Sequence, residues 1–226
     1  MCRLLMVRGE TELDPATYLG QFREISRQSR EYQGHGWGCA WLAQNGHWQF
    51  YRNLNPVWED ETNNFPETRL FIAHARSAFR DEGICIENNM PFSDGNTVFV
   101  FNGELQGVRI REEGRIGAEK IYNYLKRFDR GDLGAAVSRG IGVIDKRTRY
   151  IRAMNIFLAE SNAVHVVSWF GEEPEYFQMR QAIDHRAHII CSMPLDLASQ
   201  PEWHRIPNHT VFRVSLDQPL EISQAC

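Results

Sequence analysis

The sequence lacks several features that would place it in a common class of protein. No apolar run approaches the roughly 18 residues that span a bilayer, and the first nine residues become polar too early for a signal peptide. Positive charge is not in excess, since 25 basic residues stand against 29 acidic ones, for a net charge of −4. Basic residues also form no long run. We therefore expect a cytoplasmic protein that binds neither a membrane nor a nucleic acid.

Cysteine and histidine are also too few and too scattered to indicate a disulfide framework or a zinc site. No Cys-x-x-Cys pair occurs, and the odd, widely spaced set consists of Cys2, Cys39, Cys85, Cys191 and Cys226. The group Asp184, His185 and His188 has no matched third or fourth ligand nearby. We expect neither a metal nor a cofactor.

The hydrophobic pattern predicts one domain over residues 1–226 with a layered α+β fold. With 42% hydrophobic residues the chain can bury a sizeable core. Helical spacing predicts helices over residues 14–29, 118–128 and 133–144. Short apolar runs between turn residues predict strands at Leu4–Val7, Gly36–Ala43, His47–Tyr51, Leu70–Ala75, Thr97–Phe101, Ile151–Leu158, Ala163–Phe170, His188–Cys191 and Val211–Val214. Strands grouped around a helical centre favour layers over a doubly wound parallel sheet.

The residue with the clearest chemical potential is Cys2. Removal of Met1 would leave a thiol and a free α-amine on one residue. An α-amine titrates at roughly pH 7.7–8.0, so it can serve as the base that an activated nucleophile needs. The alternative is an inert buried cysteine.

Two further motifs fit amide hydrolysis, and each also has a plain structural interpretation. Arg76 ends an apolar strand, where its planar fork could bind a carboxylate or form only a surface salt bridge. Asn102 and Gly103 follow the strand predicted at Thr97–Phe101. Together they could donate two hydrogen bonds to an oxyanion. Asn-Gly is also a common tight turn, and when the dipeptide is considered by itself the turn is the favoured interpretation.

A glycine-spaced aromatic run, Gly34-His35-Gly36-Trp37-Gly38, could allow close backbone approach to a ligand or to a neighbouring sheet. His35 could be catalytic, although a histidine in such a turn is more often structural. The run lacks the ending of a phosphate-binding loop.

Taken together and in order, five motifs resemble the class II glutamine amidotransferase family. They are Met1-Cys2-Arg3, Gly34-His35-Gly36-Trp37-Gly38, His74-Ala75-Arg76, Asn88-Asn89-Met90-Pro91-Phe92 and Phe101-Asn102-Gly103. The resemblance implies a four-layer αββα sandwich of the N-terminal-nucleophile hydrolase type. In length the chain is similar to stand-alone members without a synthase domain, including hydrolases of γ-glutamyl amides.

The resemblance also implies roles for individual residues. Cys2 would be the nucleophile, Asn102 and Gly103 would form the oxyanion hole, and Arg76 would bind the α-carboxylate of the substrate. His35, Trp37, Phe79 and Gly117 would line the substrate pocket.

Two of these positions depart from the family pattern. Gly117 stands where the family has an Asp that holds the α-ammonium of the substrate, and Phe79 stands where it has Thr. The nucleophilic residues are therefore retained while the amino-acid pocket is altered. Glu119 and Asp94 are nearby carboxylates that could replace the missing charge.

These observations predict a cysteine-dependent hydrolase of a small-molecule γ-glutamyl-type amide. Cleavage would proceed through a thioester on Cys2 and release ammonia or an amine. An alternative is an ammonia-supplying subunit of a separate synthase. Another alternative, favoured by Gly117, is a catalytically altered ligand-binding or regulatory subunit that retains the fold.

Overall fold

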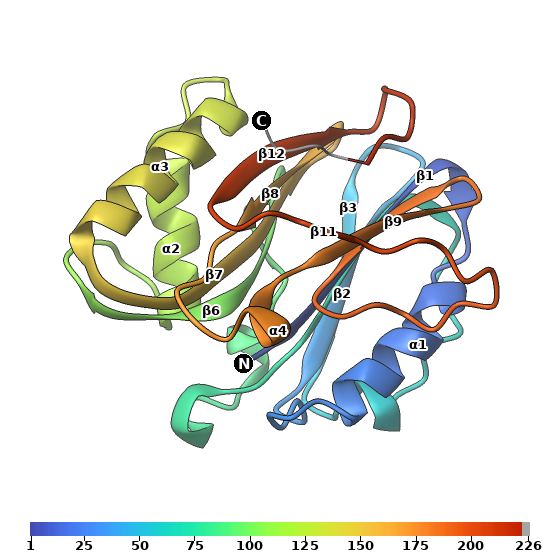
Figure 1. The fold of residues 1–226 in the computed structure, drawn as a ribbon, viewed down its shortest axis with the longest axis horizontal. Helices are drawn as coiled ribbons and strands as arrows, with labels where there is room; N and C mark the ends of the chain where they lie inside the picture. Colours follow the sequence, from blue (N-terminus) through green and yellow to red (C-terminus); the bar gives the residue numbers. More distant parts are fainter. Residues whose placement is uncertain (223–226) are drawn as a thin grey trace.

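The computed structural model describes residues 1–222, and Cys226 lies outside this range. Two antiparallel sheets lie face to face, with helices on both outer faces (Figure 1). This arrangement is the αββα sandwich that the family resemblance implies.

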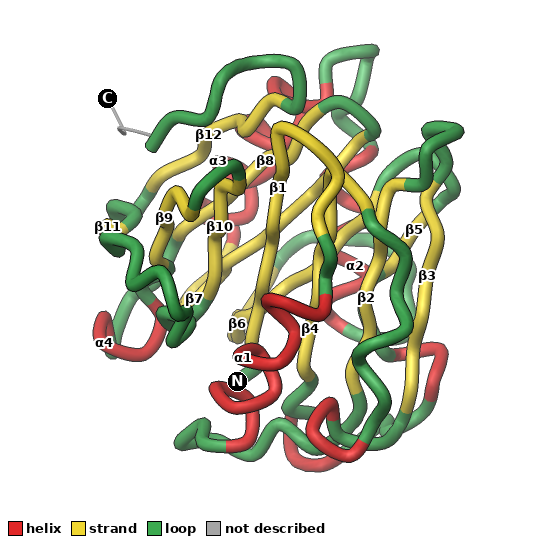
Figure 2. Tube along the Cα trace, turned by 90° about the vertical axis from the view of Figure 1, so that its right-hand side faces the viewer, coloured by secondary structure: helices red, strands yellow, loops and turns green. Residues whose placement is uncertain are grey.

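The first sheet has seven strands in the order β11-β9-β10-β1-β4-β2-β3. Figure 2 shows β1 and β4 side by side in its middle, behind α1. The strands are β1 (Arg3–Leu13), β2 (Trp37–Leu42), β3 (Trp48–Asn53), β4 (Thr68–Ala75), β9 (Arg180–Asp184), β10 (Ala187–Cys191) and β11 (His204–Arg205).

The second sheet has five strands in the order β12-β8-β7-β6-β5. Its two longest strands, β6 and β7, pair over most of their length. The strands are β5 (Phe92–Ser93), β6 (Val98–Val108), β7 (Thr148–Glu160), β8 (Ala163–Ser168) and β12 (Thr210–Ser215).

The helices form the outer layers. The four α-helices are α1 (Ala16–Arg27), α2 (Gly117–Lys126), α3 (Leu133–Arg147) and α4 (Pro174–Phe177), and short 3₁₀ turns cover Val57–Glu59, Phe79–Asp81 and Ile86–Asn88. Helix α1 packs on the seven-stranded sheet through Leu19 and Phe22. Helices α2 and α3 pack on the five-stranded sheet (Figure 1), where Leu125 and Val137 join its core.

The central position of β1 explains the unbroken apolar run Leu4–Val7 within it. Leu4 and Met6 belong to the core between the sheets, whereas Leu5 and Val7 belong to the core beneath α1. Successive side chains of a strand point to opposite faces, so a strand covered on both faces needs apolar residues throughout. The first residues of the chain are consequently anchored in the middle of the molecule.

The strands and helices predicted from the sequence are present, with ends shifted by a few residues. One prediction is wrong: the strand that begins near Thr97 does not stop at a turn after Phe101. β6 continues through Asn102 and Gly103 to Val108 because both residues pair with β7. The short strands β5, β9 and β11 and helix α4 were not predicted.

Candidate active site

The register between β1 and β4 brings Cys2 to the end of β4. Arg3 pairs with Ala75, so Cys2 lies beside the segment that follows the strand. The Ser77 N–H donates to the Cys2 Sγ at 3.4 Å, and the Cys2 thiol lies 3.7 Å from the Ser77 carbonyl oxygen. Residues 75 positions apart in the sequence therefore form one site.

The environment of Cys2 has opposing effects on the pKa of its thiol. Burial raises the pKa of Cys2 because it destabilises the thiolate. The α-ammonium group, the Ser77 N–H and the Arg76 guanidinium lower the pKa, and Glu31 raises it. The net result is a pKa above the ordinary value, so the thiol is protonated at neutral pH while Met1 is present.

The N-terminus is held by a network of charges. The Met1 ammonium group forms an ion pair with Glu31, which also accepts from Arg152 Nη2 at 3.0 Å. Burial alone would raise the pKa of Glu31, but these two cations lower it below its usual value. The Met1 carbonyl accepts from Gln33 Nε2 at 2.5 Å and from the Tyr176 hydroxyl at 3.1 Å. The main chain just before Cys2 is thereby fixed.

The Asn102 side chain has an unusual environment on β6. It is fully buried, and neither of its amide atoms has a hydrogen-bond partner within residues 1–222. Its cross-strand neighbour Asn155 is equally buried but is satisfied, since it donates to the Phe177 carbonyl at 2.7 Å and accepts from the Trp169 N–H at 3.1 Å. Buried polar groups are rarely left without partners, so the Asn102 amide is a candidate ligand-binding group.

Gly103 and the N-terminus meet at β7. A Cβ on Gly103 would lie 2.1 Å from the Ala153 carbonyl oxygen, so only glycine fits there. Met1 packs against the cluster that contains Ala153. The strand segment with Asn102 and Gly103 thus lies close to the start of the chain.

Arg76 follows β4 and is 4% exposed. Nη1 donates to Asn89 Oδ1 at 3.1 Å, and Nη2 donates to the Gly83 carbonyl at 2.8 Å. Burial lowers its pKa, but an arginine stays protonated. These hydrogen bonds use two of the five N–H groups of the Arg76 guanidinium and fix its orientation.

His35 holds the loop that follows Arg76. Its Nδ1 accepts from the Ala78 N–H at 2.9 Å, and its Nε2 lies 3.4 Å from Asp81 Oδ1. Burial lowers the pKa of His35 more than Asp81 raises it, so the ring is neutral at pH 7. Phe79 sits on this loop with 62% of its surface exposed. The predicted contacts of both residues with a substrate stay predictions.

The remaining two predicted site residues are Trp37 and Gly117. Trp37 has no exposed surface, donates to Asp60 Oδ2 at 2.7 Å and packs against Tyr51 and Phe65. The structure therefore places its side chain in the core. Gly117 is the exposed first residue of α2, and a Cβ there would meet no atom within 4 Å.

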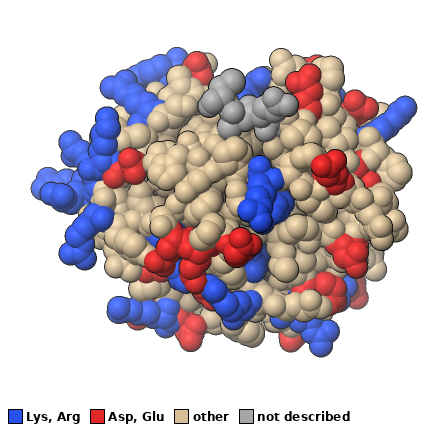
Figure 3. Space-filling model, viewed as in Figure 1, with Lys and Arg blue, Asp and Glu red and all other residues tan. Residues whose placement is uncertain are grey.

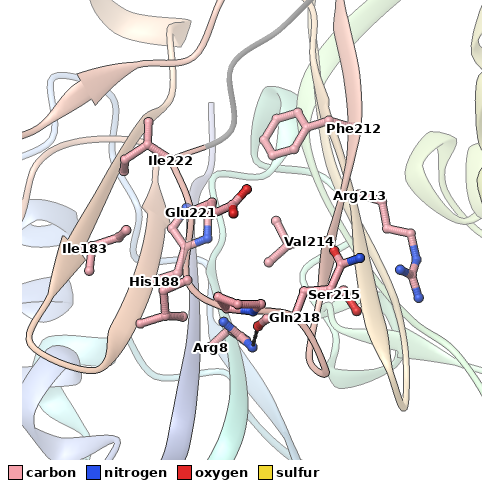
Figure 4. A pocket seen from close by; sticks show the side chains of 12 residues that line it. Arg8, Ile183, His188, Phe212, Arg213, Val214, Ser215, Gln218, Glu221 and Ile222 are labelled. Atoms are coloured by element: carbon pink, nitrogen blue, oxygen red, sulfur yellow. Dashed lines mark hydrogen bonds between the residues drawn. The ribbon is translucent and has the colours of Figure 1, made fainter.

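A cavity of about 650 Å³ contains none of these residues. Arg8, His188 and residues 218–222 contribute to its wall, and Arg8 points toward Gln218 (Figure 4). Within the described residues, no three His, Cys, Asp or Glu side chains are grouped so that they could hold a metal ion. No helix of this part of the chain is long and apolar enough to cross a membrane. The group of Cys2, Arg76 and Asn102 is therefore taken as the candidate site.

Several solved structures have the same architecture. The chain matches a glutamine aminotransferase class-II domain protein from Silicibacter pomeroyi with 14% identity and a TM-score of 0.64, covering 95% of both chains. It matches the glutamine phosphoribosylpyrophosphate amidotransferase from B. subtilis with 13% identity and a TM-score of 0.65, covering 97% of this chain and 50% of that enzyme. A predicted glutamine amidotransferase from Pseudomonas aeruginosa matches with 13% identity and a TM-score of 0.55, covering 98% of this chain and all of that one. The chain has the class II glutamine amidotransferase fold. No protein-family model and no curated protein matches the sequence.

Within this amidotransferase fold, the two carboxylates that could replace an Asp at position 117 are both paired. Glu119 forms an ion pair with Arg115 at 2.5 Å, and Asp94 pairs with Lys126 at 3.2 Å. Their charges are already balanced by neighbours, so neither is a free partner for an ammonium group.

Three residues of the site had no signal in the sequence. Glu31, in the loop after α1, pairs with the N-terminus, and Arg152 on β7 pairs with Glu31. Asn155 supports the strand opposite Asn102. The two charged residues look like ordinary surface charges in the sequence, and Asn155 interrupts an apolar run without a recognisable motif. Only the tertiary contacts assign them to the site.

Proposed function

We propose that this protein is an amide hydrolase in which Cys2 is the nucleophile and a γ-glutamyl-type amide is the substrate. The observation that carries the proposal is the buried, unpartnered amide of Asn102 near an N-terminal cysteine. Such an amide is already desolvated and free of competing hydrogen bonds, which suits stabilisation of an oxyanion. The amidotransferase fold supports the same assignment.

The proposed reaction begins after Met1 is removed, when the α-amine of Cys2 takes the proton of its own thiol. Sγ then attacks the amide carbonyl carbon, and the oxyanion accepts hydrogen bonds from Asn102 Nδ2 and the Gly103 N–H. Collapse of this intermediate breaks the C–N bond. The leaving nitrogen takes the proton from the α-ammonium group, which leaves a thioester on Cys2 and free ammonia or an amine.

Water completes the cycle. The α-amine accepts a proton from water as the hydroxyl adds to the thioester, and the thiolate leaves with that proton. The products are a carboxylic acid and the free Cys2 thiol. No electron transfer occurs, and the proposed route uses no cofactor.

Arg76 would bind the carboxylate of the substrate. Its hydrogen bonds to Asn89 and Gly83 orient the guanidinium, and its burial makes an ion pair stronger than on the surface. In this role Arg76 selects and positions the substrate without contacting the reacting carbonyl.

Ammonia supply to a separate synthase subunit would need the same reaction of Cys2 as the hydrolase, whereas a second candidate function is ligand binding without turnover. The observation that favours it is Gly117, which offers no charge to an α-ammonium group, while Glu119 and Asp94 are already paired. Both candidates use the same pocket and differ in whether Cys2 reacts.

The experiment that tests the function is reaction with an electrophilic glutamine analogue followed by intact-mass measurement. Protein that lacks Met1 should gain one adduct, located on Cys2 by peptide mapping, and should release ammonia or an amine from a γ-glutamyl amide. Protein that retains Met1 and the Cys2→Ala variant are the controls and should stay unmodified. Absence of an adduct on processed protein would favour ligand binding without turnover, and full activity in protein that retains Met1 would exclude the α-amine as the base.

A further inference from the structure

A second cavity lies on the helical side of the five-stranded sheet and is lined mainly by arginine. Its volume is about 480 Å³, which lies within the range of pockets that hold small ligands. Six guanidinium side chains contribute to it from the segment after β6, the end of α2, the following loop and α3: Arg109, Arg111, Arg127, Arg130, Arg139 and Arg147. No acidic residue is among its lining residues within the described part of the chain.

This concentration of charge opposes the charge of the molecule as a whole, which is −4. Lys and Arg side chains gather along the left edge in Figure 3, over α2 and α3. Arg127 pairs with Glu112 at 3.2 Å. Among residues 1–222 the other five arginines form no ion pair with a carboxylate. Like charges close together repel each other, so the cavity favours a multiply charged anion.

Two aromatic rings order part of this cluster. The Arg127 guanidinium lies 5.9 Å from the Tyr124 ring centroid, and the Arg139 guanidinium lies 5.4 Å from the Phe128 ring centroid. The two rings pack edge to face at 5.2 Å. Cation–π contacts hold these two guanidinium groups near the rings. The two arginine side chains therefore lose less conformational entropy when a ligand binds.

The cavity is separate from the candidate active site. Asn102 and Val108 are six positions apart on β6, which is about 20 Å of extended strand. The arginine cavity begins after Val108, with Arg109. An anion in this cavity would therefore not contact Cys2.

We propose that this cavity binds the phosphate chain of a small di- or triphosphate. Several forked guanidinium groups around a concave site match adjacent phosphate groups, each of which accepts paired hydrogen bonds. The same chemistry is present in free triphosphate and in a nucleoside triphosphate, and the exposed parts of Tyr124 and Phe128 would favour the latter.

The test is isothermal titration calorimetry on the full chain at a constant ionic strength of about 0.15 M. The ligands are inorganic triphosphate, ATP and citrate, and the last is a multiply charged anion without phosphate. The variant R111Q/R139Q removes two guanidinium groups from different segments of the cavity. The control R27Q/R186Q removes the same charge from exposed arginines elsewhere. Thermal melting checks that each variant is folded, and R130Q/R147Q repeats the test with two other arginines.

We expect triphosphate and ATP to bind the wild type and the control alike. Both cavity variants should bind about 100-fold more weakly, or tenfold for each lost guanidinium. Equal affinity for triphosphate and ATP would assign recognition to the phosphate chain, whereas tighter binding of ATP would add a contact with the base. No binding to the wild type, equal loss in the control, unchanged binding in both cavity variants, or equally tight binding of citrate would overturn the proposal.

Discussion

Asn102 and Asn155 provide a matched pair for testing the candidate oxyanion hole. They are the same residue type, pair directly across β6 and β7, and are both fully buried. They differ in that Asn155 has partners for both amide atoms, whereas within residues 1–222 Asn102 has none. We predict that Asn102→Leu and Asn155→Leu change stability in opposite directions.

The magnitudes follow from the unpaired groups. A buried polar group without a partner destabilises the folded state by about 1–3 kcal/mol, and leucine has a similar shape without polar atoms. Asn102→Leu should therefore raise the free energy of unfolding by about 1–3 kcal/mol, or roughly 2–4 °C in Tm for each kcal/mol. Asn155→Leu leaves the Phe177 carbonyl and the Trp169 N–H unpaired. Its free energy of unfolding should therefore fall by about 1–3 kcal/mol for each of these two groups.

The assay combines urea unfolding with steady-state kinetics on the processed protein. Asn102→Leu and Asn102→Ala should lower kcat by about 10²–10³, the effect of removing one oxyanion donor. A gain in stability together with this loss would show that the unpaired amide is retained for function. If Asn102→Leu were destabilised as strongly as Asn155→Leu, or kept kcat within a few-fold of wild type, the assignment of Asn102 would be refuted.

The remaining predictions concern the nucleophile, the carboxylate site, the altered pocket and acid stability. Cys2→Ala should abolish turnover, as followed by product release, while leaving the melting curve of the fold intact. Arg76→Lys should mainly raise KM for a γ-glutamyl amide, because it removes binding shared by ground and transition states; an equal fall in kcat would contradict this role. Free glutamine should be a poor substrate compared with amine-blocked glutamine, because Glu119 and Asp94 are already paired and an ammonium group that leaves water without a partner is disfavoured. Gly117→Asp should improve kcat/KM for glutamine, and the open space around Gly117 accommodates the new side chain. Finally, burial lowers the pKa of His74 to about 3, so between its usual value of 6.5 and about 3 only the unfolded state binds the proton. Stability should fall as pH falls through this window, and urea unfolding of His74→Gln should show a weaker dependence on pH.

The sequence predicted most of the secondary structure because the apolar residues follow the periods of strands and helices. β1 and α1 are examples, since β1 contains the unbroken apolar run Leu4–Val7 and α1 has one apolar stripe. The strand β9 was missed because it carries Gln181 and Asp184 at buried positions. Its polar residues become compatible with burial through contacts such as that between Gln181 and His188, at 3.1 Å, which a local pattern does not contain.

The candidate site was predicted less completely for the same reason. The chemistry of Cys2 and Arg76 depends on residue type and is visible in the sequence, but their proximity depends on the register of β1 and β4. At Asn102 and Gly103 the local preference for a turn is overridden by pairing with β7, so the dipeptide becomes buried strand. The position of Trp37 was likewise decided by packing, because its indole has a partner in Asp60 and can be fully buried.

The network around the N-terminus connects processing with reactivity on the proposed mechanism. While Met1 is present, its ammonium group is held by Glu31 and lies one residue away from the thiol. Burial then keeps the pKa of Cys2 high despite the favourable effects of the ammonium group, the Ser77 N–H and Arg76. Removal of Met1 would place the amine on Cys2 itself, and the interaction between thiolate and ammonium strengthens as their separation falls. It would also remove the side chain that packs against the cluster of Ala153, Phe170, Tyr176 and Phe177. Both changes favour the thiolate, so loss of one residue would convert a protonated, covered thiol into an activated nucleophile.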